Sequence, residues 1–345
     1  MELTNKKWKE FSIEDIFTIK SGKHLTKIDM ISGKIPFIGA TDSNNGITEF
    51  IANKNSSLDK NVLGVNWNGS VGYSFYHSYE AVFSGDVKRL SFREIEGNMY
   101  SFLFIKALII QQKSKYGYGY KFNGERMKRQ KILLPINSKG EPDYAFMESY
   151  MRQKEMELLK QYEKQVSEFE SVIPLSEKEW KEFKTTDIFN DIQRGKRLKK
   201  DDHISGVMPY VSSTGINNGV DGFVGNKENV RIFSNCLTLA NSGSVGATFY
   251  QPFSFVASDH VTKLGNDKFN TYIYLFIANM MSRFSEKYSF NREINDTRIK
   301  KEKILLPINS QGKPDYAYME NYMKALECEK IKQYLRYKKQ KTKND

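Results

Sequence analysis

The chain repeats itself once, and this internal duplication constrains its fold more than any other feature of the sequence. The segment KILLPINSKGEPDYAFMESYM at 131–151 returns as KILLPINSQGKPDYAYMENYM at 303–323, an offset of 172, with differences at only four of 21 positions. The tetrapeptide WKEF at 8–11 returns at 180–183 with the same offset. Solenoid repeats run roughly 20–50 residues, so we interpret two copies of this length as two homologous domains.

Shorter motifs continue the duplication between these ends, in the same order. The offset drifts from 172 to 174 and back, which indicates small loop insertions that are balanced within each copy. A chain of 345 residues is long enough for two domains with a core each. The paired motifs are IPF and MPY at 35–37 and 208–210, NNG at 44–46 and 217–219, and GSVG at 69–72 and 243–246.

Each copy has the same coarse pattern of predicted structure. Short apolar runs separated by Asn, Gly and Ser predict a small, loop-rich β structure. An aromatic-rich segment follows, at 99–111 or 271–283, and is long enough for a buried helix. An Ile-Leu-Leu-Pro-Ile strand at 132–136 or 304–308 completes the copy. The pattern predicts an α+β fold with two homologous β-rich domains and a pseudo-twofold internal repeat.

A long amphipathic helix is predicted after each of these strands. Asp143 and Asp315 are good N-cap candidates, and Pro174 stops the first helix before the second domain. The predicted divisions are a domain at 1–141, a helix at 142–173, a domain at 174–313, and a helix with a basic tail at 314–345. The apolar residues expected on partner-binding stripes are Met147, Met151, Leu158, Tyr162 and Val166, and Met319, Met323, Leu326 and Ile331.

These helices have two possible partners. Each could pack on its own domain, or the two could pair with each other. Duplicated domains present equivalent stripes, which favours pairing of the helices. A helix of about 30 residues spans on the order of 45 Å, more than one turn of B-DNA. A pair could therefore hold the two domains at a set distance.

The charge balance favours a polyanionic partner. There are 53 Lys and Arg against 41 Asp and Glu, giving a formal net charge of +12 and a pI near 9.3. The partner could be nucleic acid or an acidic membrane surface. The most apolar stretches, 100–110 and 272–281, are too short to span a bilayer. Two cysteines without a disulfide pattern, and a polar start without a signal peptide core, predict a reducing, cytoplasmic location.

The two copies differ most in polar, basic loops, and these are the predicted DNA contacts. A shared scaffold with different loops suits two different base sequences, because Lys and Arg position a protein on phosphates while polar side chains read base edges. The GSVG turns suit either a plain hairpin or a close approach to a DNA phosphate. The candidate contacts are Lys20, Lys23, Lys27, Asn44, Tyr116, Tyr118, Lys121, Asn123 and Arg126, and Arg194, Lys196, Arg197, Lys199, Asn217, Lys287, Asn291 and Arg292.

Motifs of catalysis are not found in the sequence. It has no Pro-Pro pair, so the [NDS]-P-P-[YF] motif of amino-methyltransferases is missing. The GxxxxGK[ST] pattern of nucleotide-binding loops is missing too. Its four histidines show no zinc spacing, and Ser258-Asp259-His260 is no triad because successive strand residues point to opposite faces. We predict no catalytic residue, no metal site and no bound cofactor.

Taken in order, these motifs resemble those of the DNA specificity subunit of type I restriction-modification systems. The resemblance covers nearly the whole chain and rests on the repeated W-K-x-F opening, the S/R-G-K turn, the I-P-[FY] strand, the N-N-G and G-S-V-G turns, and the strand ending in L-P-I before a helix. The ending ILLPINSxGxPDYxxMExYM departs from the I-P-x-P of type I subunits. It resembles subunits that accompany fused restriction-methyltransferase polypeptides of type IIB-like systems.

The resemblance implies a non-catalytic subunit that reads a bipartite, asymmetric site in duplex DNA. Each domain would recognise one half-site, and the two helices would pair antiparallel, set the gap and dock the modification subunits. Those partners would bind S-adenosylmethionine and methylate adenine, and a separate or fused polypeptide would carry restriction activity. Two alternatives are a stand-alone nucleic-acid-binding protein that bridges two sites and a nuclease with an unrecognised site.

Overall fold

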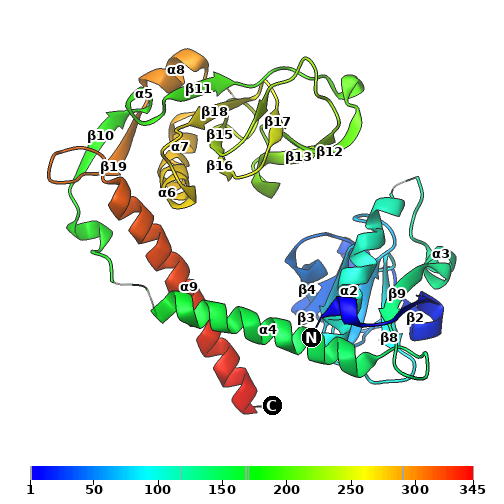
Figure 1. Cartoon of the computed structure of the whole chain (residues 1–345). Coiled ribbons are helices and arrows are strands. Elements are labelled where there is room, and N and C mark those ends of the chain that lie inside the picture. The colour runs from blue at the N-terminus through cyan, green and yellow to red at the C-terminus, as the bar shows by residue number, and fades with distance from the viewer. Residues whose placement is uncertain (1, 118, 168, 170, 290, 345) are drawn as a thin grey trace. The chain divides into compact units, whose positions relative to one another are not determined.

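The computed structural model describes residues 2–117, 119–167, 169, 171–289 and 291–344 (Figure 1). Its contacts divide the chain into two compact units, Met1–Gln161 and Tyr162–Asp345. The second unit repeats the elements of the first in nearly the same order. The two-domain α+β prediction is therefore confirmed.

The WKEF and KILLP motifs form a two-stranded ribbon in each unit. In the first, β1 (Trp8–Ser12) pairs antiparallel with β9 (Lys131–Pro135), and Trp8 lies opposite Pro135. In the second, β10 (Trp180–Lys184) pairs with β19 (Lys303–Pro307) in the same register. On β9, Ile132 and Leu134 are buried while Leu133 is exposed, as the two-residue period of a strand requires.

Two further sheets complete the β structure of the first unit. Between β5 and β6 lies the first GSVG turn, so the hairpin interpretation of this motif is confirmed. The first sheet is ordered β2 (Phe17–Ser21), β8 (Val87–Phe92), β5 (Val62–Asn66) and β6 (Ser74–His77). The second is ordered β4 (Ile47–Ile51), β3 (Ser32–Ile38) and β7 (Val82–Phe83), with β3 and β7 parallel.

The second unit has equivalent sheets, with one added edge strand. Its second GSVG turn likewise joins β15 to β16 in a hairpin. The first sheet is ordered β11 (Asp191–Arg194), β18 (Val261–Gly265), β15 (Cys236–Ala240) and β16 (Thr248–Gln251). The second is ordered β13 (Val220–Val224), β12 (Ser205–Val211), β17 (Phe255–Ala257) and β14 (Ile232–Phe233).

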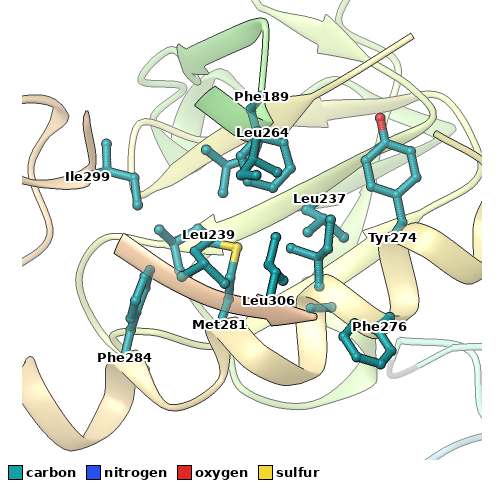
Figure 2. Packing of buried hydrophobic residues seen from close by; sticks show 14 of the residues in the cluster. Phe189, Leu237, Leu239, Leu264, Tyr274, Phe276, Met281, Phe284, Ile299 and Leu306 are labelled. Carbon is teal, nitrogen blue, oxygen red and sulfur yellow. The ribbon is translucent and has the colours of Figure 1, made fainter. Parts of the chain in front are cut away.

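Each unit builds its main core between the first sheet and an apolar helix, α2 (Met99–Gln111) or α6 (Thr271–Met281). Asparagine begins both helices: Asn98 accepts a hydrogen bond from the Ser101 amide, and Asn270 one from the Ile273 amide. Figure 2 shows the second core, where Leu237, Leu239 and Leu264 from the sheet meet residues of α6 and β19. Short helices complete the units: α1 (Ile13–Ile16), α3 (Gly124–Arg129), α5 (Thr185–Ile188), α7 (Phe284–Lys287) and α8 (Asp296–Lys301).

Two long helices, α4 (Tyr144–Ser167) and α9 (Tyr316–Asn344), begin where the sequence predicts. The carboxylate of Asp143 accepts a hydrogen bond from the Phe146 amide, and that of Asp315 accepts one from the Tyr318 amide, each at 3.0 Å. Both capping predictions are confirmed. The end predicted for the first helix is wrong, since α4 ends at Ser167. The β-branched pair before Pro174 disfavours helix there.

The first members of each predicted stripe have another role. Met147 and Met319 are fully buried in the cores of their own units, because the first turn of each helix packs against that core. Met151 and Met323 pack against the same cores. The surface available to a partner therefore begins further along each helix. Exposed or half-buried stripe residues are Leu158, Tyr162, Val166, Leu326 and Ile331.

Helices able to cross a membrane are not found among the described residues, since none is both long and apolar enough.

Candidate nucleic-acid interface

The S/R-G-K turn follows the edge strand β2 or β11 in each unit. In the first unit, the Gly22 amide donates to the Val87 carbonyl at 3.0 Å, which ties the turn to β8. A Cβ added at Gly22 would lie 1.9 Å from the Ser84 carbonyl oxygen, and one at Gly195 would lie 2.0 Å from that of Ser258. Only glycine allows the two backbone segments to approach so closely, so the glycine of this motif is required by the fold.

The basic residues on either side of these glycines reach the surface. Their exposure agrees with the predicted role in phosphate contact and does not test it. The exposed candidates in this part of the two units are Lys20, Lys23 and Lys27, and Lys196, Arg197 and Lys199.

A polar cluster lies beside this turn in the first unit, at the end of the main sheet. Ser21 and Lys88 are cross-strand partners, and the Lys88 ammonium donates to the Ser21 hydroxyl at 2.7 Å. Lys88 lies 5.5 Å and the predicted Lys121 5.9 Å from the centre of the Trp67 ring. Burial lowers the pKa of Lys88 from its usual value. We call Ser21, Trp67, Asn68, Asp86 and Lys88 the first sheet-end cluster.

The equivalent positions of the second unit carry different side chains. Arg194 lies opposite Thr262, and its Nε donates to the Asp259 carbonyl at 2.6 Å. The Thr262 hydroxyl donates to the side-chain oxygen of Asn241 at 2.8 Å, and the side-chain nitrogen of Asn241 is buried without a partner among the described residues. We call Arg194, Asn241, Ser242, His260 and Thr262 the second sheet-end cluster.

The loop after α2 forms an open pocket of about 500 Å³ in the first unit. The rings of Tyr116 and Tyr120 stack at 5.7 Å with an interplanar angle of 5°. The Arg126 guanidinium lies 3.8 Å from the centre of the Tyr120 ring. Asn123 accepts a hydrogen bond from the Arg126 amide at 3.0 Å, so it caps α3. Tyr116, Asn123 and Arg126 are thus brought together, while the predicted Tyr118 lies outside the described residues.

The corresponding loop of the second unit contains a carboxylate, that of Glu302, whose side chain is 11% exposed. Glu302 forms an ion pair with Lys287 at 2.8 Å. It also accepts a hydrogen bond from the Tyr288 hydroxyl. Burial and this carboxylate raise the pKa of Tyr288 to about 12. Lys287 is therefore held by an acidic partner, which weakens its case as a phosphate contact. Arg292 and Asn291 are exposed, and the Arg292 guanidinium lies 5.3 Å from the centre of the Tyr288 ring.

Both Asn-Asn-Gly turns present their first asparagine to solvent. Asn44 and Asn217 adopt left-handed backbone angles, with φ of 49° and 51°, and both are exposed. The second asparagine is also exposed, and its side chain ties the turn to a neighbouring residue. The Asn45 amide donates to the Tyr79 hydroxyl at 2.9 Å, and that of Asn218 donates to Gln251 at 3.0 Å.

These surfaces carry ammonium, guanidinium, amide, hydroxyl and aromatic groups. Such groups can bind an anion or form hydrogen bonds with the edges of bases. Among the described residues, the acidic, histidine and cysteine side chains form no group of three suited to a metal ion. The Cys236 thiol is buried, which raises its pKa to about 12 and keeps it protonated.

Several residues at these sites were missed by sequence reasoning. Lys88 is not among the predicted contacts because it lies in a strand rather than in a divergent loop. A comparison of aligned positions along the strands would have found it. The missed residues are Trp67, Asn68, Asp86, Lys88, Tyr120, Arg129, Gln130 and Lys131, and Asn241, Ser242, His260 and Thr262.

Comparison with known proteins connects both units to one family. The model of the type I restriction modification DNA specificity domain matches residues 5–168 and 177–336. Each match contains one copy of the duplicated motifs.

Individual relatives are similar over different shares of the chain. The type II restriction enzyme specificity subunit S.BcgI of Heyndrickxia coagulans is 60% identical over 148 residues, 43% of this chain and 43% of that protein. A Mycoplasma pneumoniae protein named as a type I specificity subunit, S.MpnORF507P, is 27% identical over 315 residues, 86% of this chain and 84% of that protein. The crystal structure of a type I S subunit from M. genitalium matches 98% of this chain and 94% of that one, with 16% identity and a TM-score of 0.43.

Proposed function

This chain belongs to the family of type I restriction modification DNA specificity domains, and we propose that it reads a bipartite, asymmetric site in duplex DNA. Its two recognition domains are of the kind found in specificity subunits of restriction-modification systems. One observation carries the proposal. The two domains share their strands and register, yet they differ in the polar side chains that reach their surfaces.

Each domain would recognise its own half-site. Exposed cations near the S/R-G-K turns would contact phosphates and hold the domain in position. Side chains that differ between the domains would contact base edges, so the two half-sites would differ in sequence. The excess of 12 positive charges supports binding to a polyanion such as duplex DNA.

We further propose that α4 and α9 pair antiparallel and set the gap between the half-sites, which would make the duplication pseudo-twofold. Contacts within the second unit support this. The Tyr162 ring, near the end of α4, lies 6.2 Å from the Tyr334 ring of α9, and Gln165 donates to Glu327 at 2.8 Å. The 24 residues of α4 span about 36 Å, close to one turn of B-DNA.

Catalysis is assigned to partners. DNA methyltransferase subunits would bind S-adenosylmethionine, flip the target adenine and methylate it, and this chain would hold no cofactor. Restriction activity would come from a separate subunit or from a fused restriction-methyltransferase polypeptide. Similarity over 148 residues to the specificity subunit of a type II restriction enzyme supports a partner of the type II kind.

Co-expression of the full chain with its methyltransferase partner tests the proposal. Methylated adenines are mapped in the host DNA with and without this chain. A split motif with a fixed gap, present only with the chain, supports the proposed function.

Two other outcomes would support other functions. Tight binding with little sequence preference and no methyltransferase complex would indicate a stand-alone nucleic-acid-binding protein. Cleavage of DNA by the purified chain with a metal ion alone would indicate a nuclease.

A further inference from the structure

The two sheet-end clusters stand on the same backbone and carry different side chains. The Trp67 amide donates to the Asp86 carbonyl at 3.1 Å, and the Asn241 amide makes the equivalent bond to the His260 carbonyl at 2.8 Å. Nevertheless all five aligned positions differ. The aligned pairs are Ser21 and Arg194, Trp67 and Asn241, Asn68 and Ser242, Asp86 and His260, and Lys88 and Thr262.

The cross-strand pair in each cluster exchanges a hydroxyl and a cation. In the first unit, the cation Lys88 lies on the inner strand β8 and Ser21 on the edge strand β2. In the second unit, the cation Arg194 lies on the edge strand β11 and Thr262 on the inner strand β18. Adjacent strands are about 4.8 Å apart, so the positive charge moves by one strand while the total charge of the pair is kept.

We propose that Ser21 and Lys88 in the first domain and Arg194 in the second are specificity-determining residues that contact base edges in the two half-sites, while Thr262, which is buried, supports the strand beneath Arg194. This assignment rests on the proposed function. Contact with phosphate alone would not require a different arrangement in each domain, because both domains already carry exposed lysines beside the same turn. A cation that moves between strands of a retained scaffold changes which base it can reach.

The chemistry of each pair identifies the kind of base contact. Arg194 presents a planar guanidinium, which the Asp259 carbonyl orients through Nε at 2.6 Å, and this geometry suits the paired acceptors O6 and N7 of guanine. Lys88 is a compact donor held by Ser21 at 2.7 Å, and it suits a single purine acceptor. Neighbouring pairs also differ: Asn68 with Asp86 at 2.9 Å against Ser242 with His260 at 2.7 Å.

A charge-preserving exchange tests this assignment in the full chain bound to its methyltransferase subunits. The double variants S21R/K88T and R194S/T262K each install the residues of the other domain, and the folding of R194S/T262K is checked first because Thr262 is buried. Bound duplexes are selected from a random library and sequenced. Each variant is expected to lose roughly 10- to 100-fold discrimination at one or two base pairs of its own half-site, with the other half-site unchanged.

Controls separate this effect from charge and from misfolding. K54T removes an exposed lysine of the first unit and is expected to leave both half-sites unchanged. R194K keeps the charge and loses the planar fork, so about tenfold discrimination is expected to disappear at one base pair even if a double variant does not fold.

Three outcomes would overturn the assignment. Unchanged motifs in R194K and in a folded double variant would show that these pairs do not read bases. Affinity lost equally for all sequences would show phosphate contact instead. If the unaltered complex selects no split motif, the proposed function falls and this assignment falls with it. If a split motif is selected and the variants leave it unchanged, only the assignment falls.

Discussion

The loops that follow α2 and α6 place a tyrosine and a lysine at equivalent positions, but the partners of these two side chains differ in charge. In the first unit the Tyr116 hydroxyl donates to the neutral Gln130, whereas in the second the Tyr288 hydroxyl donates to the anionic Glu302. The carboxylate recruits Lys287, and the equivalent Lys115 instead bonds Gln112 on its own turn. One amide-to-acid difference thus pairs a surface cation with a carboxylate, although the lysine itself is kept and stays exposed.

The interiors of the two units differ as well, and two aligned positions illustrate this. His77 of β6 corresponds to Gln251 of β16, and both are fully buried. Arg89 of β8 corresponds to Lys263 of β18, and each pairs with an aspartate from a different place in its unit. The two domains therefore keep the same backbone while the buried side chains and ion pairs that stabilise it differ. Substitutions at these positions test whether the side chains stabilise each unit as their contacts imply.

The largest difference is expected at Arg89. Its side chain is 6% exposed, pairs with Asp59 at 2.8 Å and donates to the Ser21 carbonyl at 2.9 Å. R89A should cost about 3–5 kcal/mol because it leaves a partly buried charge unpaired. K263A should cost about 0–1 kcal/mol, since its partner Asp191 is 49% exposed. Hydrogen exchange of the full chain would measure the stability of each unit separately. Equal losses of stability in R89A and K263A would contradict the expected difference.

His77 should make the first unit sensitive to acid. Burial, and then the charge of Lys106, lower the pKa of His77 to about 4 in the folded chain. As the pH falls below 6.5, the unfolded chain takes up the proton first, so stability is complete above pH 6.5 and declines towards pH 4. The loss reaches about 3 kcal/mol.

Calorimetry of the full chain at pH 5.0 and 7.5 would measure this effect. H77Q, which copies the second unit, should remove the pH dependence, and Q251H should introduce it there. If the melting temperature of the wild-type chain falls between pH 7.5 and 5.0 by no more than that of H77Q, the pH dependence does not come from His77.

Salt dependence should separate free from paired cations. K196A/R197A should reduce the slope of log affinity against log salt by about two units if both residues contact phosphates. K287A should leave the slope nearly unchanged, because Glu302 already neutralises this charge. Fluorescence anisotropy with duplex DNA at 50–200 mM salt would measure the slopes. A larger change for K287A than for the double variant would reverse the ranking.

The smallest difference is expected where the two units are alike. Lys6 pairs with Asp143 at 2.5 Å, and Lys178 pairs with Asp315 at 2.9 Å, at the start of each long helix. K6A and K178A should each cost below about 1 kcal/mol, and by similar amounts, because the caps themselves remain. Urea denaturation would compare them. Unequal costs would show that the two helix starts are not equivalent.

Much of the fold could be predicted because it depends on local chemistry. The boundaries of α2, the start of both long helices and the hairpin at each GSVG turn follow from capping residues, apolar runs and turn residues. The stripe predictions for Met147 and Met319 failed for a tertiary reason. Periodicity shows that residues share a helix face, but it does not tell which neighbour covers that face.

The candidate site was predictable only in part. Tyr116, Asn123 and Arg126 lie close in sequence, so a divergent loop revealed them together. Lys88 and Trp67 join Lys121 through strand pairing and ring contact, and these depend on residues more than 20 positions apart. Pairing of Lys287 with Glu302 was equally hidden, because both loops contain the lysine.

The sequence by itself determined the duplication, the two domains, the long helices and the family, since each of these is written in spacing, charge and motif order. Only the tertiary structure decided which cations stand beside one another and which are neutralised. Strand register places Lys88 opposite Ser21 and Arg194 opposite Thr262, so that a charge changes strand between the domains. Register depends on which distant segments pair, and that pairing is a property of the folded chain rather than of its local sequence.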